Sequence, residues 1–173
     1  MSKSRPERIA ILLIALCWGL NWPAVRTALE EIPPWTLLVI GMGAGAAVLF
    51  LFATIRGQRR LMKRQEWLPV LTVGFLSITA FNLLLSFAQL AAPTSRAVIV
   101  TFAMPIWTVI FARWILGEKL DCRRWLSVSL GAAGLICLGV PLIASGAFGY
   151  GIVLALLAGM SWALGTGAMR EFG

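Results

Sequence analysis

Six apolar stretches of about 20 residues follow one another along the chain, and short connections separate them. About 20 helical residues, each rising 1.5 Å, cross a hydrocarbon core of roughly 30 Å. The stretches are Ile9–Ala28, Trp35–Ile55, Trp67–Leu90, Ala97–Leu116, Trp125–Ala144 and Tyr150–Met169. The chain is 60% hydrophobic and contains no histidine, which places it outside the range of soluble domains. The sequence therefore predicts an all-α integral membrane protein with six transmembrane helices.

The net charge of +8 is concentrated on alternate connections. In this assignment 13 of the 15 Lys and Arg residues lie on one side of the membrane, and only Arg26 and Arg96 lie on the other. Cytoplasmic loops carry such an excess of basic residues. We therefore expect a multi-pass protein of a bacterial-type inner (plasma) membrane with a cytoplasmic N-terminus. The charge indicates topology and membrane lipid headgroups as partners, and it does not indicate nucleic acid.

The first stretch resembles a secretory signal only weakly. Leu16 stands where a lipoprotein-type cleavage site needs a small residue before Cys17, and the apolar run continues to Ala28. Retention as a helix is favoured. The other cysteines, Cys122 and Cys137, show no metal-ligand spacing with Cys17, and we interpret all three as packing residues without a disulfide.

An internal repeat links the first stretch to the sixth. A shift of 144 residues aligns Leu12–Arg26, "LLIALCWGLNWPAVR", with Leu156–Arg170, "LLAGMSWALGTGAMR". The match includes Trp18 with Trp162 and Arg26 with Arg170. One unit then contains five spans, an odd number, so the second unit starts on the opposite side of the membrane. Inverted repeats of this kind build many secondary transporters.

The repeat divides the chain into three parts. A cytoplasmic tail covers residues 1–8, a five-helix transmembrane repeat covers residues 9–144, and residues 150–173 form the first helix of a second repeat. We expect the chain to be the N-terminal part of a protein with about ten spans, or a truncated product.

Three motifs resemble a known family. "CWGLNWPAVR" (Cys17–Arg26) resembles the first-helix signature of the drug/metabolite transporter superfamily, specifically its EamA-like family. "APTSRAVIVTFAMPIWTVIFARWILGEKL" (Ala92–Leu120) is similar to that family's fourth helix, and "GAAGLICLGV" (Gly131–Val140) looks like its glycine-rich fifth helix. The resemblance implies ten helices in two inverted five-helix repeats and transport of small metabolites, such as amino acids, without ATP hydrolysis.

Polar residues follow one face of the third stretch at helical spacing. They are Thr72, Thr79, Asn82, Ser86 and Gln89. Amide and hydroxyl groups in hydrocarbon need partners, so this stripe should face protein or a water-filled cavity. Two interpretations stay open: hydrogen bonds between helices, or a substrate cavity lined by Asn82, Ser86 and Gln89.

The fourth and first stretches offer further candidates. Thr94, Thr101, Pro105 and Thr108 form a similar stripe, and Pro105 removes the donor for the Thr101 carbonyl, which predicts a kink or an exposed acceptor. In the first stretch the cavity candidates are Trp18, Asn21 and Trp22. Tryptophan also packs well between helices, so packing and cavity lining are both open for Trp18.

Two arginines break the charge pattern. Arg26 and Arg96 either reach the outer headgroups or pair with Glu30 and Glu31, or they anchor a substrate carboxylate. Glu118 is expected to pair with Lys119, Arg123 or Arg124. The glycines of Gly41–Ala47, with Gly131, Gly134 and Gly139, are expected at close helix contacts.

Other motifs of chemistry are absent from the sequence. It contains no Walker-type loop, no Ser-His or Cys-His pair and no metal cluster, so we expect no enzyme activity, cofactor or metal. The leading hypothesis is a transporter of amino-acid or drug-like solutes that works by alternating access, with efflux as the expected direction. The alternatives are a small dimeric multidrug-type antiporter, which needs a glutamate that the first helix lacks, and a non-transporting interaction or flippase subunit. Expected partners are a small-molecule substrate and either the missing second repeat in cis or a second copy of the chain.

Overall fold

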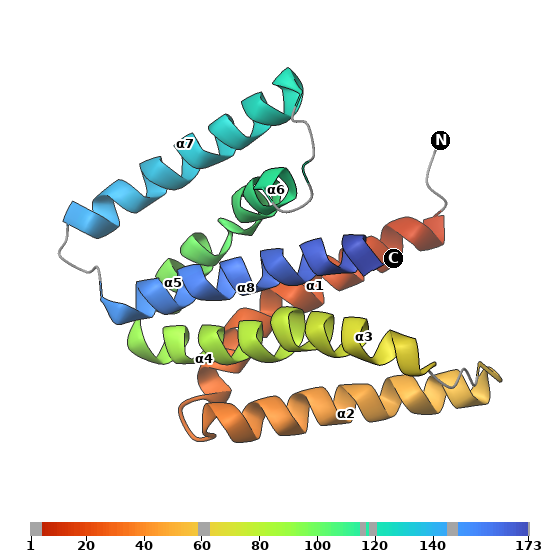
Figure 1. Cartoon of the computed structure of the whole chain (residues 1–173). Coiled ribbons are helices and arrows are strands. Elements are labelled where there is room, and N and C mark those ends of the chain that lie inside the picture. The colour runs from red at the N-terminus through yellow and green to blue at the C-terminus, as the bar shows by residue number, and fades with distance from the viewer. Residues whose placement is uncertain (1–4, 59–62, 115–116, 118–120, 145–148, 173) are drawn as a thin grey trace.

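The computed structural model describes residues 5–58, 63–114, 117, 121–144 and 149–172, and this part of the chain is helical without any strand (Figure 1). The α-helices are α1 Arg5–Ala28, α2 Pro34–Ile55, α3 Trp67–Gly74, α4 Phe81–Ala91, α5 Thr94–Thr101, α6 Met104–Trp114, α7 Cys122–Ala144 and α8 Tyr150–Phe172. A 3-10 turn, η1, covers Arg64–Glu66, and a π-helical segment, η2, covers Phe75–Ala80.

These elements form six spans that are long and apolar enough to cross a membrane. Four of them are single helices, namely α1, α2, α7 and α8. The third span, Arg64–Ala91, joins η1, α3, η2 and α4, and the fourth, Thr94–Trp114, joins α5 and α6. The prediction of an all-α membrane protein with six transmembrane helices is confirmed.

Helix α2 illustrates how the sequence ends a span. Pro34 occupies the first turn, where its missing N–H is not needed. At the other end Gly57 adopts a φ of 68°, which suits glycine, and its N–H bonds the Thr54 carbonyl. The N–H of Gln58 reaches back to Ala53, which completes a Schellman motif. The last carbonyls of α2 therefore have partners before the chain turns back.

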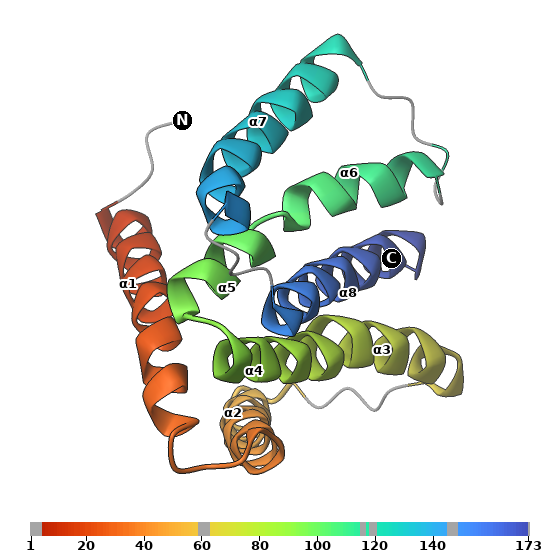
Figure 2. The ribbon, with the colours of Figure 1, turned by 90° about the vertical axis from the view of Figure 1, so that its left-hand side faces the viewer.

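Helix α8 lies at the centre of the described structure. It runs between the third span on one side and the fourth span on the other (Figures 1 and 2). Its side chains at the contact are small, and Ala155, Ala158 and Ala163 are fully buried. Small residues let helix backbones approach closely in a membrane, where apolar burial gives no drive between helices. The core is therefore a close contact of backbones around α8.

Three glycines of α8 make this contact. A Cβ added at Gly151 would lie 2.9 Å from the Cβ atoms of Ala91 and Ala92, where α4 ends. A Cβ at Gly159 would lie 3.2 Å from the Thr101 carbonyl oxygen. At Gly165 it would overlap the Ser77 hydroxyl and lie 3.0 Å from the Ser77 nitrogen. Each glycine therefore faces a place where the third or fourth span ends or is interrupted.

The expectation of close contacts at the other glycines is wrong. A Cβ at Gly41, Gly43 or Gly45 of α2 would meet nothing within 4 Å, and the same holds for Gly131, Gly134 and Gly139 of α7. Both helices lie at the edge of the described structure (Figure 2), with most of their side chains exposed. Small-residue spacing marks a face that can be approached closely, but it does not say which helix approaches.

The interpretation of the cysteines as packing residues is also wrong for the described structure. Cys17, Cys122 and Cys137 are free, as expected, but all three are exposed, so they are not packing residues here. They lie on α1 and α7, which pack against few neighbours. Their apolar character suits a surface that faces lipid.

The third and fourth spans are both interrupted near their middle. In the third span, α4 contributes 11 residues after η2, and η1 and α3 together contribute 11 residues before it. In the fourth span α5 ends at Thr101, Phe102 and Ala103 form a turn, and α6 begins at Met104. The kink expected from Pro105 is confirmed, because proline cannot donate to the Thr101 carbonyl. Both interruptions therefore lie near the bilayer midplane.

We expect Gly165→Ala to lower the free energy of unfolding by about 1–3 kcal/mol, because the new methyl group must displace the Ser77 hydroxyl and crowd the Ser77 backbone nitrogen. Gly167→Ala is the matched control, since its Cβ would meet nothing within 4 Å and alanine favours a helix. Denaturation in detergent, followed by circular dichroism, measures both. Equal stability of the two variants would contradict the close contact.

Candidate functional site

The two interruptions face each other across α8, and we call their contact with it the midspan junction. Its members, from the third span, the fourth span and α8, are Leu76, Ser77, Thr101, Gly159, Ser161 and Gly165. The Ser161 hydroxyl donates to the Leu76 carbonyl of η2 over 2.8 Å. Interrupted backbone at membrane depth is tolerated only where protein or a water-filled cavity covers it. Helix α8 supplies that cover for both spans.

The junction holds polar side chains away from lipid. Thr101 is fully buried, and its hydroxyl donates to the Ala97 carbonyl over 2.7 Å. Ser77 is 8% exposed, and its hydroxyl has no hydrogen-bond partner among the described residues. A buried polar group without a partner is unusual in a folded protein. The junction therefore keeps an unused hydrogen-bonding group at mid-depth.

The π-helical segment changes which residues of the third span face α8. Regular helical spacing places Thr79 on the polar stripe, but the structure exposes Thr79 and buries Ser77. A π-helical turn bonds residue i to i+5 and so takes up one more residue than an α-helical turn. The assignment of Thr79 to the packed face is therefore wrong, and Ser77 takes its place.

Several predicted polar residues bond to their own helix. Asn82 donates to the Ile78 carbonyl over 2.8 Å, and Ser86 donates to the Asn82 carbonyl over 2.8 Å. Thr108 makes the same kind of bond to Met104 over 2.9 Å. A short side chain in a helix reaches the carbonyl four residues back. The interpretation of Asn82 and Ser86 as links between helices is therefore wrong for the described structure, and cavity lining stays a prediction.

A second polar group lies at the end of α4. Gln89 is 1% exposed, and its side-chain oxygen has no partner in the described part of the chain. The Arg26 guanidinium of α1 donates to the Gln89 backbone carbonyl. This carbonyl belongs to the last turn of α4, where carbonyls lack helical donors. Arg26 thus caps a neighbouring helix, a partner that the sequence interpretation did not include.

The other candidates lie farther from these two groups. Trp22 packs near Phe102 at the break in the fourth span, with ring centroids 6.4 Å apart. Trp18 is 63% exposed and Asn21 is also exposed in the described structure, so cavity lining stays a prediction for both. Arg96 is half-buried, and no described residue pairs with its side chain.

Of the candidates, the structure places Thr101 in the midspan junction and Pro105 on the side of the fourth span that faces α7, whereas Gln89 and Arg26 meet at the end of α4. Sequence reasoning missed Ser77, which only the π-helical turn brings inward, and it did not assign Ser161, although Ser161 lies in the repeated motif. The predicted pairing of Glu118 lies outside the described residues. Within the described ranges no group of three His, Cys, Asp or Glu residues could hold a metal ion.

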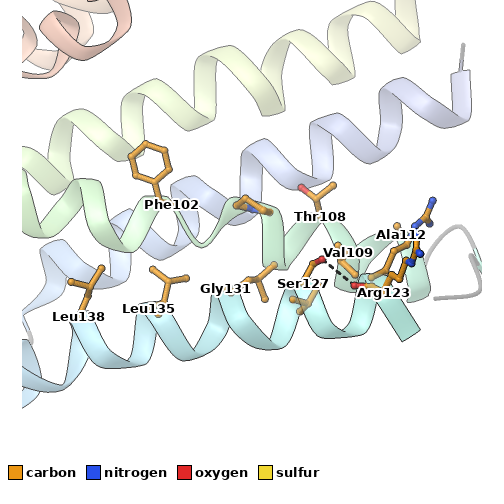
Figure 3. Close-up of a pocket in the computed structure, with 14 residues that line it drawn as sticks. Phe102, Thr108, Val109, Ala112, Arg123, Ser127, Gly131, Leu135 and Leu138 are labelled. Atoms are coloured by element: carbon orange, nitrogen blue, oxygen red, sulfur yellow. Dashed lines mark hydrogen bonds between the residues drawn. The ribbon is translucent and has the colours of Figure 1, made fainter. Parts of the chain in front are cut away.

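A cavity of about 630 Å³ lies between the fourth span and α7 (Figure 3). Pro105 and Thr108, both from the predicted stripe of the fourth span, line it. Its walls are otherwise mostly apolar, and Arg123 and Arg124 lie at one end. The cavity is therefore separate from the polar group around Gln89.

Comparison with known proteins identifies the class. The model of the EamA-like transporter family matches residues 6–140, so the chain belongs to this family. It is 31% identical to "Uncharacterized transporter YvbV" of Bacillus subtilis, over all of this chain and 57% of that protein. It is 27% identical to "Uncharacterized inner membrane transporter YedA" of Escherichia coli, over 91% of this chain and 51% of the relative.

A further relative has a named cargo. The chain is 26% identical to "Aromatic amino acid exporter YddG" of Ancylobacter novellus, over 96% of this chain and 60% of that protein. The chain thus spans about half the length of the curated relatives it matches. No solved structure matches it significantly. The chain therefore belongs to the EamA-like transporter family, and these relatives are named as transporters.

We expect Ser161→Ala to lower the free energy of unfolding by about 1 kcal/mol, because the Leu76 carbonyl loses its hydroxyl donor. Ser127→Ala is the control, since Ser127 bonds only to its own helix, at the Arg123 carbonyl, on the exposed surface. Thermal unfolding in detergent compares the two variants. If Ser161→Ala unfolds no earlier than Ser127→Ala, the bond between α8 and η2 does not stabilise the fold.

Proposed function

We propose that the chain forms one half of a secondary transporter that exports small metabolites of the amino-acid or drug-like type by alternating access. The observation that carries this proposal is the pair of mid-depth interruptions on opposite sides of α8. Transporters of this construction bind substrate near the bilayer midplane, between repeats, where interrupted helices offer backbone groups. The family match and the relative named as an amino acid exporter support the same function.

The chemistry of the described residues favours a neutral or zwitterionic cargo. Gln89 offers a buried amide oxygen without a partner, and Ser77 offers a buried hydroxyl. Trp22 and Phe102 supply aromatic surface next to the break. A polar group that stays buried without a partner is costly unless water or a ligand completes it. We infer two separate contacts along the transport path: substrate or ordered water bonds to Ser77 at mid-depth, and substrate or ordered water bonds to Gln89 near the end of the third span.

A second five-helix unit is the partner that we propose for this chain. By the repeat, α8 corresponds to α1, and α8 lies between the third and fourth spans of the first unit. An inverted second unit would enclose α1 in the same way, which gives the exposed Trp18 a packing site like that of Trp162 on Phe81. A homodimer of parallel copies cannot reproduce this inverted pairing. The second unit in cis is therefore preferred to a second copy.

Transport by the complete reading frame that contains this chain tests the function. Counterflow of aromatic and aliphatic amino acids is measured in proteoliposomes. We expect Gln89→Met to lower flux about fivefold, because one ligand hydrogen bond of about 1 kcal/mol is lost. Membrane abundance should stay normal or rise, since the variant removes a buried unpartnered group. Gln65→Met, at an exposed glutamine of η1, is the control.

Three outcomes would decide between the parts of this proposal. Absence of flux for every solute tested would count against the transport function itself. Normal flux in Gln89→Met would remove Gln89 from the site and leave the function standing. An equal fall in flux and abundance would make Gln89 a structural residue.

We further propose a cytoplasmic N-terminus in the inner membrane. Basic residues flank the connection between α2 and η1, whereas Glu30 and Glu31 lie between α1 and α2. In a cysteine-free background, we expect an impermeant maleimide to label Glu30→Cys in intact cells and to label Gln58→Cys only after the membrane is opened. The reverse pattern would invert the topology.

A further inference from the structure

The cavity between the fourth span and α7 has the form of a groove, which we call the α6–α7 groove. It lies on the side of the fourth span away from the midspan junction, and α7 packs mainly on α5 and α6 in the described structure. Leu135 and Leu138 project from α7 towards the fourth span (Figure 3). The lining residues are Phe102, Pro105, Ile106, Thr108, Val109, Ala112, Arg123, Arg124, Ser127, Val128, Gly131, Gly134, Leu135 and Leu138.

The length of the groove matches one leaflet of a bilayer. Along α7 the groove begins at Arg123 and Arg124, and its mostly apolar part runs from Ser127 to Leu138, over which the helix rises by about 16 Å at 1.5 Å per residue. Half of a hydrocarbon core of about 30 Å is about 15 Å. Phe102, in the turn near the middle of the fourth span, lines the end of the groove at the bilayer midplane. The groove therefore runs from the edge of the hydrocarbon to the midplane.

The end of the groove at the membrane surface resembles a lipid headgroup region. Arg123 and Arg124 line it, and no described residue pairs with the Arg123 guanidinium. Trp114 ends α6 with 80% of its surface exposed, and Trp125, in the first turn of α7, is 56% exposed. Tryptophans gather at the level of lipid headgroups. Positive charge thus lies where a lipid phosphate would lie.

The inner part of the groove is not filled by its own side chains. A Cβ added at Gly131 or Gly134 would meet nothing within 4 Å. The surrounding lining is apolar, with Leu135 and Leu138 of α7 and Phe102 of the fourth span, so ordered water has few polar partners there. An apolar chain fits this part better than water does.

We propose that the α6–α7 groove binds one anionic phospholipid, with an acyl chain along Gly131, Gly134 and Leu138 and the phosphate on Arg123 and Arg124. Basic pockets between transmembrane helices recognise anionic headgroups, and one guanidinium group can donate two parallel hydrogen bonds to a phosphate. The site is separate from the transport site proposed above and does not depend on it. The lipid would fix α7 against the fourth span, where direct helix contact is sparse.

Photolabelling of the purified chain in nanodiscs tests the proposal. Phosphatidylglycerol and phosphatidylcholine with the same diazirine-bearing acyl chain are compared, and mass spectrometry measures labelling of α7. We expect phosphatidylglycerol to label α7 about tenfold more strongly. The double variant Arg123→Gln/Arg124→Gln should remove this preference. Arg56→Gln/Arg64→Gln, which removes two charges at the end of α2 and the start of η1, should keep it.

A second pair of variants tests the apolar part. Gly134→Leu fills the groove, whereas Gly139→Leu adds the same side chain on the same helix outside the lining, and neither Cβ meets an obstacle. Labelling of α7 should fall only in Gly134→Leu, with helicity by circular dichroism unchanged in both. Should Gly134→Leu fail to fold, the arginine variants still decide.

Three results would overturn the proposal. Equal labelling by the two lipids would mean a non-specific lipid shell. Unchanged preference in Arg123→Gln/Arg124→Gln would remove the phosphate contact. Loss of α7 labelling in the complete reading frame, with labelling elsewhere retained, would mean that a second unit fills the groove.

Discussion

Backbone groups that lose their helical partners inside a membrane must find others in the protein, and this requirement governs how the chain packs. The third span becomes π-helical near its middle, and the fourth breaks before Pro105. Ser161 donates to the Leu76 carbonyl, while Gly159 comes close to the Thr101 carbonyl. One helix with a narrow face therefore covers both interruptions, and it lies between the two spans as a consequence.

The six spans could be predicted because length and hydropathy alone determine whether a segment crosses a bilayer. The break in the fourth span was also predictable, since Pro105 lacks the N–H that an intact helix needs. The π-helical segment was not, because Phe75–Ala80 contains neither proline nor glycine, and only its contact with α8 distinguishes it. Close glycine contacts were expected in α2 and α7 and are found in α8, because close approach depends on a neighbouring helix that the local sequence does not identify.

The contacts of the candidate site also fall into those that the sequence predicted and those that it did not. Burial of Gln89 and Thr101 followed from their helical spacing and polarity. The partner of Arg26 did not, because the Gln89 carbonyl is 63 residues away in the chain and offers no side-chain signal. The hydroxyls of Ser86 and Thr101 bond to their own helices, an outcome that spacing does not distinguish from a bond to a neighbour.

The π-helical segment gives the third span a property that a regular helix lacks. A π-turn holds one residue more than an α-turn, and one residue corresponds to a rotation of about 100° around the helix axis. If the wide turn moves along the helix by one position, the residue that it passes rotates by this amount while both helix ends stay fixed. The third span can therefore exchange the side chain presented to α8, Ser77 for a neighbour, without tilting or sliding in the bilayer.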